Sequence, residues 1–270
     1  MFKKLKKFIK KKLNLSKREK FGLAVGLLTL VFLSIQLASS SWRFPLVGFS
    51  LILTYLFCAW GLEEDLRGIE WVTLFILPVM FVASLSLFYF LLPVRWLTRL
   101  PVAIIFALGV YAILLVENIY NVAGERTIQL LRAAHSVGLL LTLFTNFLFL
   151  ALIFALHLPF YGNALLVFLI SFPLILQILW SMKLEEKITS ELMRFTLVLS
   201  LAISELALVF SFWPIPTVIQ ALFLTTVFYS LVSIVQQHFV ERLFKRTLWE
   251  FISVSLIVFV FVIFTARWGG

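Results

Sequence analysis

The sequence predicts an all-α transmembrane helix bundle of about nine spans. Hydrophobic residues make up 62% of the chain and charged residues 13%, against about 45–50% and about 25% in a typical soluble domain. Nine apolar runs approach the ~20 residues that a helix needs to cross a ~30 Å hydrocarbon core. Because backbone amides in lipid must be satisfied within their own segment, these runs predict helices and not strands.

The apolar runs are separated by short polar connections. Pro78 and Pro173 fall inside two runs, and Pro214 and Pro216 lie in or after the seventh, where we expect them to break helices near a binding site. In chain order the runs are 21–38, 44–61, 71–92, 101–120, 135–156, 165–180, 195–213, 217–236 and 248–265.

Basic residues alternate between the connections. All but four of the 23 Lys and Arg residues lie in the first 20 residues or after the second, fourth, sixth and eighth runs, and the exceptions are Arg43, Arg95, Arg99 and Arg267. Basic connections face the cytoplasm in most membrane proteins. We therefore expect a multi-pass protein of the plasma or inner membrane, with a cytoplasmic N-terminus and an extracytoplasmic C-terminus.

Residues 1–20 form a basic arm before the first run. Their apolar residues recur at helical spacing between lysines, which predicts an amphipathic helix at the lipid surface with anionic lipids as its partner. A signal peptide is the alternative, but eight further runs follow. Ser16 and Glu19 predict a capping box that opens the first span. The membrane-surface candidates are Lys3, Lys4, Lys6, Lys7, Lys10, Lys11 and Lys12.

An internal repeat is the second organisational prediction. Leu62-Glu63-Glu64 resembles Leu184-Glu185-Glu186, and Arg126-Thr127 resembles Arg246-Thr247, about 120 residues apart in each case. Two units of four spans would share one orientation, related by an axis along the membrane normal, although leucine-rich helices also match one another by accident. The expected domains are the arm 1–20, a leader span 21–43, and four-helix repeats 44–157 and 158–270.

Glu205 is the acidic residue that topology does not explain, because it falls in the middle of the seventh run. Ionisable groups at this depth usually face the bundle interior and often mark function. We expect Glu205 to face a polar seam and to couple proton movement to transport; a neutral carboxyl group that serves helix packing is the alternative. The other candidates for this seam are Ser200, Ser204, Asn146, Gln177 and Gln220.

A second polar cluster surrounds the connection after the fourth run. Arg132 and His135 share a helix face, and an arginine fork suits a phosphate or a lipid head group. A solvated cytoplasmic turn is the alternative. The candidates for binding an anion or a lipid head group are Glu117, Asn118, Asn121, Arg126, Arg132 and His135.

Motifs for catalysis or metal binding do not emerge. The segment Glu63-Glu64-Asp65-Leu66-Arg67 is one residue too short for the signature of intramembrane CAAX-type proteases, and a single aspartate cannot supply the magnesium motifs of membrane prenyltransferases. Cys58 alone forms no intrachain disulfide. We expect no metal, no cofactor and no nucleic-acid partner, while a membrane-protein partner stays open.

Residues 117–138 carry the one family resemblance. The stretch from Glu117 through Asn118-Ile119-Tyr120-Asn121 to Arg132, His135 and Gly138 resembles a segment of uncharacterised multi-spanning bacterial membrane proteins of unknown function. The resemblance implies a membrane protein and no activity. We expect a transporter of a small molecule or lipid; the alternatives are an accessory or structural membrane subunit and a membrane-embedded lipid-modifying enzyme.

Overall fold

The computed structural model describes residues 16–63, 66, 68–93, 95–123 and 129–266. These residues form nine long α-helices and one short 3₁₀ helix, joined by short connections. All nine long helices are long and apolar enough to span a membrane, and the described residues contain no strand. The expected all-α membrane bundle is confirmed. The elements are α2 Lys17–Leu37, α3 Ser40–Leu62, α4 Glu70–Phe88, η1 Tyr89–Leu91, α5 Trp96–Ala123, α6 Leu131–Ala155, α7 Phe160–Lys183, α8 Ser190–Phe210, α9 Thr217–Phe239 and α10 Lys245–Thr265.

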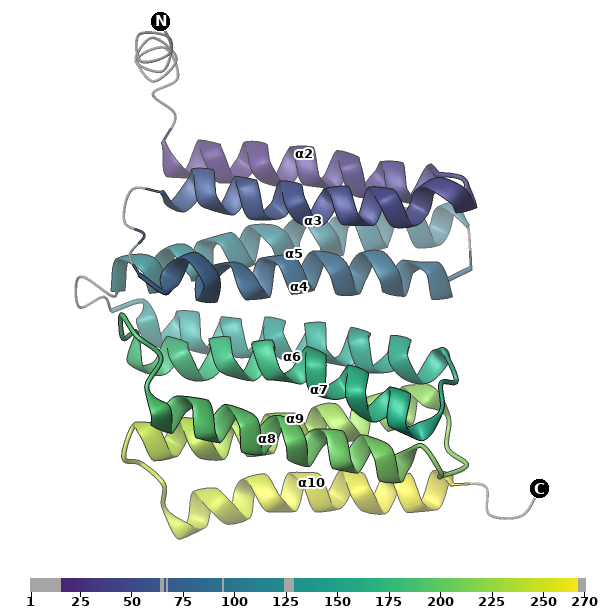
Figure 1. The fold of residues 1–270 in the computed structure, drawn as a ribbon, viewed down its shortest axis with the longest axis vertical. Helices are drawn as coiled ribbons and strands as arrows, with labels where there is room; N and C mark the ends of the chain where they lie inside the picture. The colour runs from purple at the N-terminus through teal and green to yellow at the C-terminus, as the bar shows by residue number, and fades with distance from the viewer. Residues whose placement is uncertain (1–15, 64–65, 67, 94, 124–128, 267–270) are drawn as a thin grey trace, which may run out of the picture.

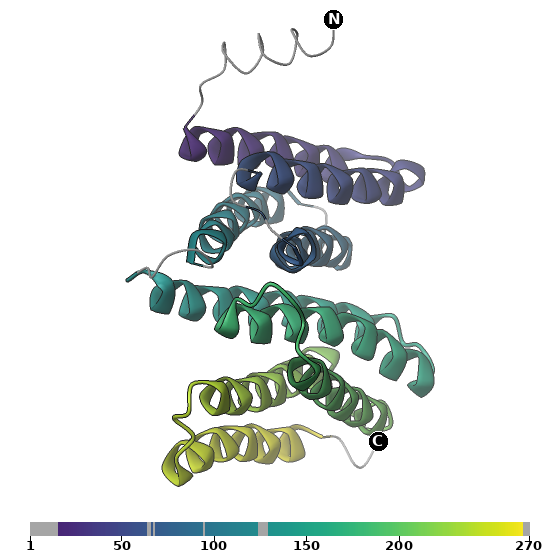
Figure 2. The same cartoon turned by 60° about the vertical axis from the view of Figure 1, so that its left-hand side comes forward.

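The helices run back and forth, so alternate connections lie at the same end of the bundle (Figure 1). They stack as a layer of α2 and α3, a layer of α4 and α5, a layer of α6 and α7, and a last group of α8, α9 and α10. Figure 2 shows α4 and α5 nearly end-on while α2, α3, α6 and α7 lie across the view, so successive layers cross. The layers are joined where α3 packs on α4 and α2 on α5, where α4 packs on α6, and where α7 packs on α8 and α6 on α9.

Burial is uneven between helices, and it identifies the centre of the bundle. In α4 twelve residues are buried, whereas in α10 only Val262 is buried. Aromatic rings fill the interior: Phe32 of α2 stacks on Phe106 of α5 with ring centroids 4.3 Å apart. At Gly109 of α5 an added Cβ would collide with the ring of Phe81 from α4, so this close approach requires glycine. α10 thus turns most of its surface towards the membrane.

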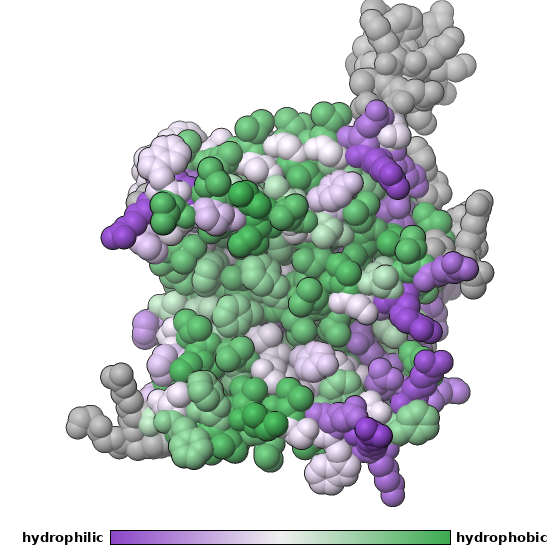
Figure 3. All heavy atoms as spheres, turned by 180° about the vertical axis from the view of Figure 1, so that it is seen from behind, coloured by the Kyte–Doolittle hydropathy of each residue, from purple (hydrophilic) through white to green (hydrophobic). Residues whose placement is uncertain are grey.

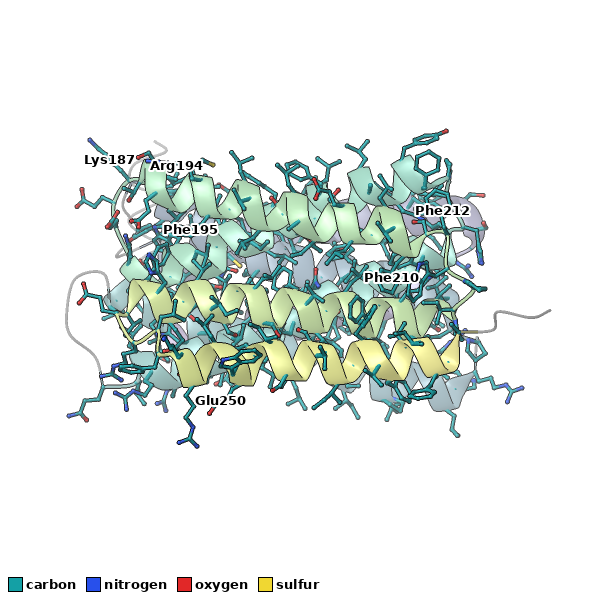
Figure 4. All side chains as sticks on the ribbon, turned by 90° about the horizontal axis from the view of Figure 1, so that it is seen from below. Lys187, Arg194, Phe195, Phe210, Phe212 and Glu250 are labelled. Atoms are coloured by element: carbon teal, nitrogen blue, oxygen red, sulfur yellow. The ribbon has the colours of Figure 1, made fainter. Side chains whose placement is uncertain are left out.

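The two ends of the bundle differ in charge. We call the end at which α2 begins the basic end. In Figure 3 charged side chains gather at this edge and a smaller group lies at the other, with an apolar band between them. Figure 4 shows Lys187 and Arg194 at the basic end of the α8 to α10 group and Phe212 at the opposite end. Among the described residues, the basic side chains at the opposite end are Arg43, Arg95 and Arg99.

The structure extends or corrects several local expectations. The capping box is confirmed, because the Ser16 N–H donates to Glu19 Oε2 over 2.7 Å and the Glu19 N–H donates to Ser16 Oγ over 3.4 Å. Pro78 and Pro173 do not break their helices, since α4 and α7 continue through them. The fourth span does not end at Tyr120, because α5 continues to Ala123.

Two expectations about organisation stay predictions. The arm with Lys3, Lys4, Lys6, Lys7, Lys10, Lys11 and Lys12 lies outside the described residues, which begin at Ser16. For the four-plus-four repeat, α3 packs on α4 as α7 packs on α8, but α4 also packs closely on α6 while α10 packs mainly on α9. The packing alone thus neither requires nor removes a duplication.

Candidate functional site

A buried carboxyl–amide pair lies inside the bundle towards the basic end. Gln177 Nε2 of α7 donates to Glu117 Oε1 of α5 over 2.6 Å, and both side chains are buried. Glu117 Oε2 and Gln177 Oε1 make no hydrogen bond to any described residue. A carboxyl oxygen accepts the amide N–H in this pair. The pair therefore leaves two buried oxygens, one on each side chain, without a hydrogen-bond partner among the described residues.

Further hydrogen bonds tie this region to the neighbouring helices. Asn121 Nδ2 donates to the Leu62 carbonyl of α3 over 3.2 Å, and the Tyr120 hydroxyl donates to the Ala134 carbonyl of α6 over 3.1 Å. His135 Nε2 lies 2.9 Å from the Ser181 carbonyl. Because a carbonyl only accepts, this contact places the hydrogen on Nε2 and leaves Nδ1 as an acceptor.

A groove opens at the basic end beside this interior cluster. We call it the basic groove; its cavity measures about 540 Å³. Its floor and walls come from the first two turns of α6, the last turns of α9, the connection after α9 and the start of α10. The lining residues are Leu131, Arg132, His135, Ser136, Leu139, Met182, Tyr229, Ser233, Gln236, Gln237, Val240, Arg242 and Phe251.

A strained turn brings Arg242 to the basic groove. α9 ends at Phe239, and Glu241 then adopts a left-handed conformation with φ 56°. The Arg242 N–H donates back to the Gln237 carbonyl over 2.9 Å, as in a Schellman turn. A side chain other than glycine in this conformation costs roughly 1–2 kcal/mol, so the surrounding contacts must hold the turn that positions Arg242.

The polar groups of the basic groove are suited to an anion. Arg132 of α6 and Arg242 come from different elements, and neither guanidinium group has an ion pair or hydrogen bond with a described residue. Among the described residues, no acidic side chain lines the groove. Ser233 is 4% exposed, and its Oγ makes no hydrogen bond to a described residue. Two arginine forks and a free hydroxyl group match the acceptor oxygens of a phosphate.

Glu205 does not occupy the interior seam that the sequence predicts. Its side chain is exposed on the outer face of α8. α8 also ends at Phe210, so Glu205 lies about 7.5 Å before the end of the helix at 1.5 Å per residue, and not at its middle. A long side chain that close to an interface reaches the polar head-group region. Glu117 of α5, by contrast, is fully buried inside the bundle.

The other residues of the expected seam serve separate places. Ser204 Oγ donates to the Ala164 carbonyl and joins α8 to α7. Gln220 Nε2 donates to the Phe210 carbonyl at the end of α8. Ser200 Oγ donates to the Thr196 carbonyl of its own helix. Asn146 is fully buried, and neither amide atom makes a hydrogen bond to a described residue.

The second predicted cluster is divided in two by the fold. Arg132 and His135 line the basic groove, as their shared helix face predicts. Glu117 and Asn121 do not lie in a solvated turn, because α5 continues past them and buries them. Asn118 is half-buried beside them, and Arg126 lies outside the described residues.

Sequence reasoning missed the part of the basic groove that α9 supplies. The sequence signal for this part was a row of polar residues at helical spacing on a mostly apolar span, namely Tyr229, Ser233 and Gln236. Arg242 was counted only for topology. Among the described residues, no group of three His, Cys, Asp or Glu side chains could hold a metal ion.

The Glu117–Gln177 pair gives a stability prediction. Glu117→Leu is expected to lower the free energy of unfolding by about 1–3 kcal/mol, because it leaves the buried Gln177 amide unpaired. Glu117→Gln should cost less, since it keeps a hydrogen-bonding partner. Adding Gln177→Leu to Glu117→Leu should restore part of the loss. Unfolding in detergent measures the free energy of unfolding of the wild type and of these three variants. Equal losses for Glu117→Gln and Glu117→Leu would contradict a specific pair.

Comparison with known proteins identifies a family and no activity. A family model described as a protein of unknown function, DUF5656, matches residues 59–265. No curated protein and no solved structure matches the chain. The match covers most of α4 to α10 and includes the basic groove and the Glu117–Gln177 pair, and it confirms the resemblance over residues 117–138. The chain belongs to the DUF5656 family of multi-spanning membrane proteins of unknown function.

Proposed function

We propose that this protein handles lipids and that it binds the phosphate head group of an anionic lipid in the basic groove. The observation that carries the proposal is the convergence of Arg132 and Arg242 on one cavity that no acidic side chain from the described part of the chain lines. In a membrane the most abundant phosphate-bearing molecules are lipids, and a cavity of about 540 Å³ is within the range of roughly 300–1,000 Å³ for small-ligand sites.

The groove also has the mixed lining that an amphiphile needs. Leu131, Leu139 and Phe251 offer apolar surface to glycerol carbons and the start of an acyl chain. Ser233 Oγ, His135 and Gln236 offer hydrogen bonds near the guanidinium groups. Because the groove lies at the basic end, a bound phosphate would sit at head-group level with its chains directed into the bilayer.

Arg132→Ala and Arg242→Ala are each expected to weaken the binding of phosphatidylglycerol about tenfold or more, because each removes a charge-assisted hydrogen bond worth about 1.5–3 kcal/mol. Native mass spectrometry of the detergent-purified protein, titrated with phosphatidylglycerol, phosphatidylcholine or inorganic phosphate, measures this. Arg194→Ala is the matched control, since Arg194 lies at the same end on α8 and outside the groove. Wild-type binding in both groove variants would favour the accessory-subunit alternative.

Transport of the head group across the membrane is the second function that an observation favours. A second cavity of about 330 Å³ lies at the opposite end and is lined by His157, Asn163 and Gln220 among others. Between the two cavities α6 packs on α9. Asn146 of α6 lies seven residues after Leu139 of the basic groove and so shares its helix face.

Buried polar atoms without a partner occur on both of these helices. Thr225 Oγ1 of α9 and both amide atoms of Asn146 are buried without a hydrogen bond to any described residue. Buried polar groups normally have partners. A passing phosphate or water molecule supplies the partners that these groups lack, which supports a transporter over a sealed subunit.

Asn146→Leu and Thr225→Val are expected to slow the transbilayer movement of fluorescent phosphatidylglycerol several-fold in reconstituted vesicles. They should not change its binding in the basic groove. Thr226→Val is the neighbouring control, because Thr226 Oγ1 already donates to the Leu222 carbonyl on a solvent- or lipid-accessible face. Movement no faster than in protein-free vesicles for the wild type would refute transport and leave lipid binding standing.

We further infer that the basic end faces the cytoplasm, because Lys and Arg concentrate there. Cys58 is the single cysteine of the chain and is buried, so introduced thiols can be read against a low background. In intact cells a membrane-impermeant maleimide should label Ser39→Cys at the opposite end and should label Lys187→Cys only after permeabilisation. The reverse pattern would invert the assignment.

A further inference from the structure

A lateral groove lies at the opposite end of the bundle, between the last turns of α2 and the first turns of α5. Its cavity measures about 390 Å³, and nearly all of its lining is apolar. Leu33 of α2 and Leu100, Ala103 and Ile104 of α5 form much of its wall. We call it the α2–α5 groove. It shares no lining residue with the basic groove and is independent of the proposed function.

Gln36 is the exception in this apolar lining. The side chain is 3% exposed, yet neither Nε2 nor Oε1 makes a hydrogen bond to a described residue. An amide group buried in this way costs about 1–3 kcal/mol unless something binds it. Because Gln36 lines the groove, an occupant of the groove is in a position to supply the missing hydrogen bonds.

Arg99 is the second polar group of the α2–α5 groove. Its guanidinium carbon lies 5.3 Å from the centre of the Trp96 ring, and its buried Nε makes no hydrogen bond to a described residue. No acidic side chain lines the groove within the part of the chain that the structure describes. The described lining therefore carries one uncompensated positive charge and attracts a negatively charged group.

The polar groups of the α2–α5 groove lie at its membrane-surface end, as the polar groups of a glycerophospholipid lie above its acyl chains. Gln36 is the last residue but one of α2, and Arg99 lies in the first turn of α5. From there the mostly apolar lining continues to Thr29 and Ala107, about 10–12 Å deeper at 1.5 Å per residue. A phosphate and an ester carbonyl near the surface, with an acyl chain below them, fit these depths.

From this arrangement we infer that the α2–α5 groove is a binding site for one glycerophospholipid. Arg99 contacts the phosphate, Gln36 Nε2 donates to an ester carbonyl, and one acyl chain lies along Leu33, Leu100 and Ala103. The site reads the phosphate–ester region that all diacyl phospholipids share. It does not require the net negative charge that suits the basic groove.

Photolabelling of the full-length chain in nanodiscs tests this assignment. The probe is phosphatidylcholine with a photoreactive group in its acyl chain, used beside its dialkyl ether counterpart, which lacks ester carbonyls. Labelling of α2 and α5 peptides is measured relative to residues 256–265 of α10, which lie outside the basic groove, bury only Val262 and report non-specific lipid contact. The ester probe should label α2 and α5 in clear excess over α10.

Gln36→Leu should lower that excess about tenfold for the ester probe and leave the ether probe unaffected. Arg99→Ala should lower it for both probes, because both retain the phosphate. Ser34→Leu and Arg95→Ala are the matched controls, since both side chains are exposed outside the groove at similar depth. Thermal unfolding should show that Gln36→Leu folds, because it removes an unpaired buried amide.

Three results would overturn the inference in whole or in part. Labelling of α2 and α5 no stronger than that of α10 would mean that the α2–α5 groove contacts bulk lipid non-specifically. Unchanged labelling in both Gln36→Leu and Arg99→Ala would mean that the polar groups do not read a lipid. Equal loss of ester and ether labelling in Gln36→Leu would overturn the ester contact. Because the probe is zwitterionic, none of these results depends on anionic-lipid binding in the basic groove.

Discussion

The absence of water from the hydrocarbon core is the constraint on which the rest of this structure depends. Helices satisfy the backbone within each span, and many hydroxyl groups do the same by bonding back one turn, as Thr54, Thr142 and Thr196 do. What then stands out is the small group of buried side chains that cannot satisfy themselves. Gln36, Asn146, Ser233 and the Glu117–Gln177 pair belong to it; Ser233 lines the basic groove and Gln36 lines the α2–α5 groove.

Hydropathy and charge predicted the spans well because both are local properties of the chain. Each apolar run is long enough to be recognised as a span without knowledge of its neighbours, and charged residues mark its ends. Whether a side chain points to the interior or to the lipid depends instead on how the helices pack. Glu205 and Glu117 both interrupt apolar sequence, but α8 turns Glu205 outward while α5 continues past Tyr120 and buries Glu117 against α7. Only the packing of the helices decides which carboxyl group is interior.

The basic groove shows why the sequence revealed half of the site. Arg132 and His135 lie one turn apart on α6, so their shared face could be read from spacing alone. Arg242 follows them more than a hundred residues later and joins them because α9 packs on α6 and because Glu241 turns the chain back. A residue that helps to set topology thus also serves as a ligand group, and an inventory of charges cannot separate the two roles.

The two grooves offer different chemistry to a lipid. In the basic groove two guanidinium groups lie with hydroxyl, imidazole and amide groups, so a lipid bound there would be recognised mostly at its charged head group. In the α2–α5 groove one guanidinium group and one amide accompany a long apolar wall, so a lipid bound there would be recognised mostly at its ester and its chain. A protein that only needed lipid as solvent would need neither set of polar groups. Retaining buried, unpaired polar groups in both places costs stability, and the lipid that we propose at each place would offset that cost.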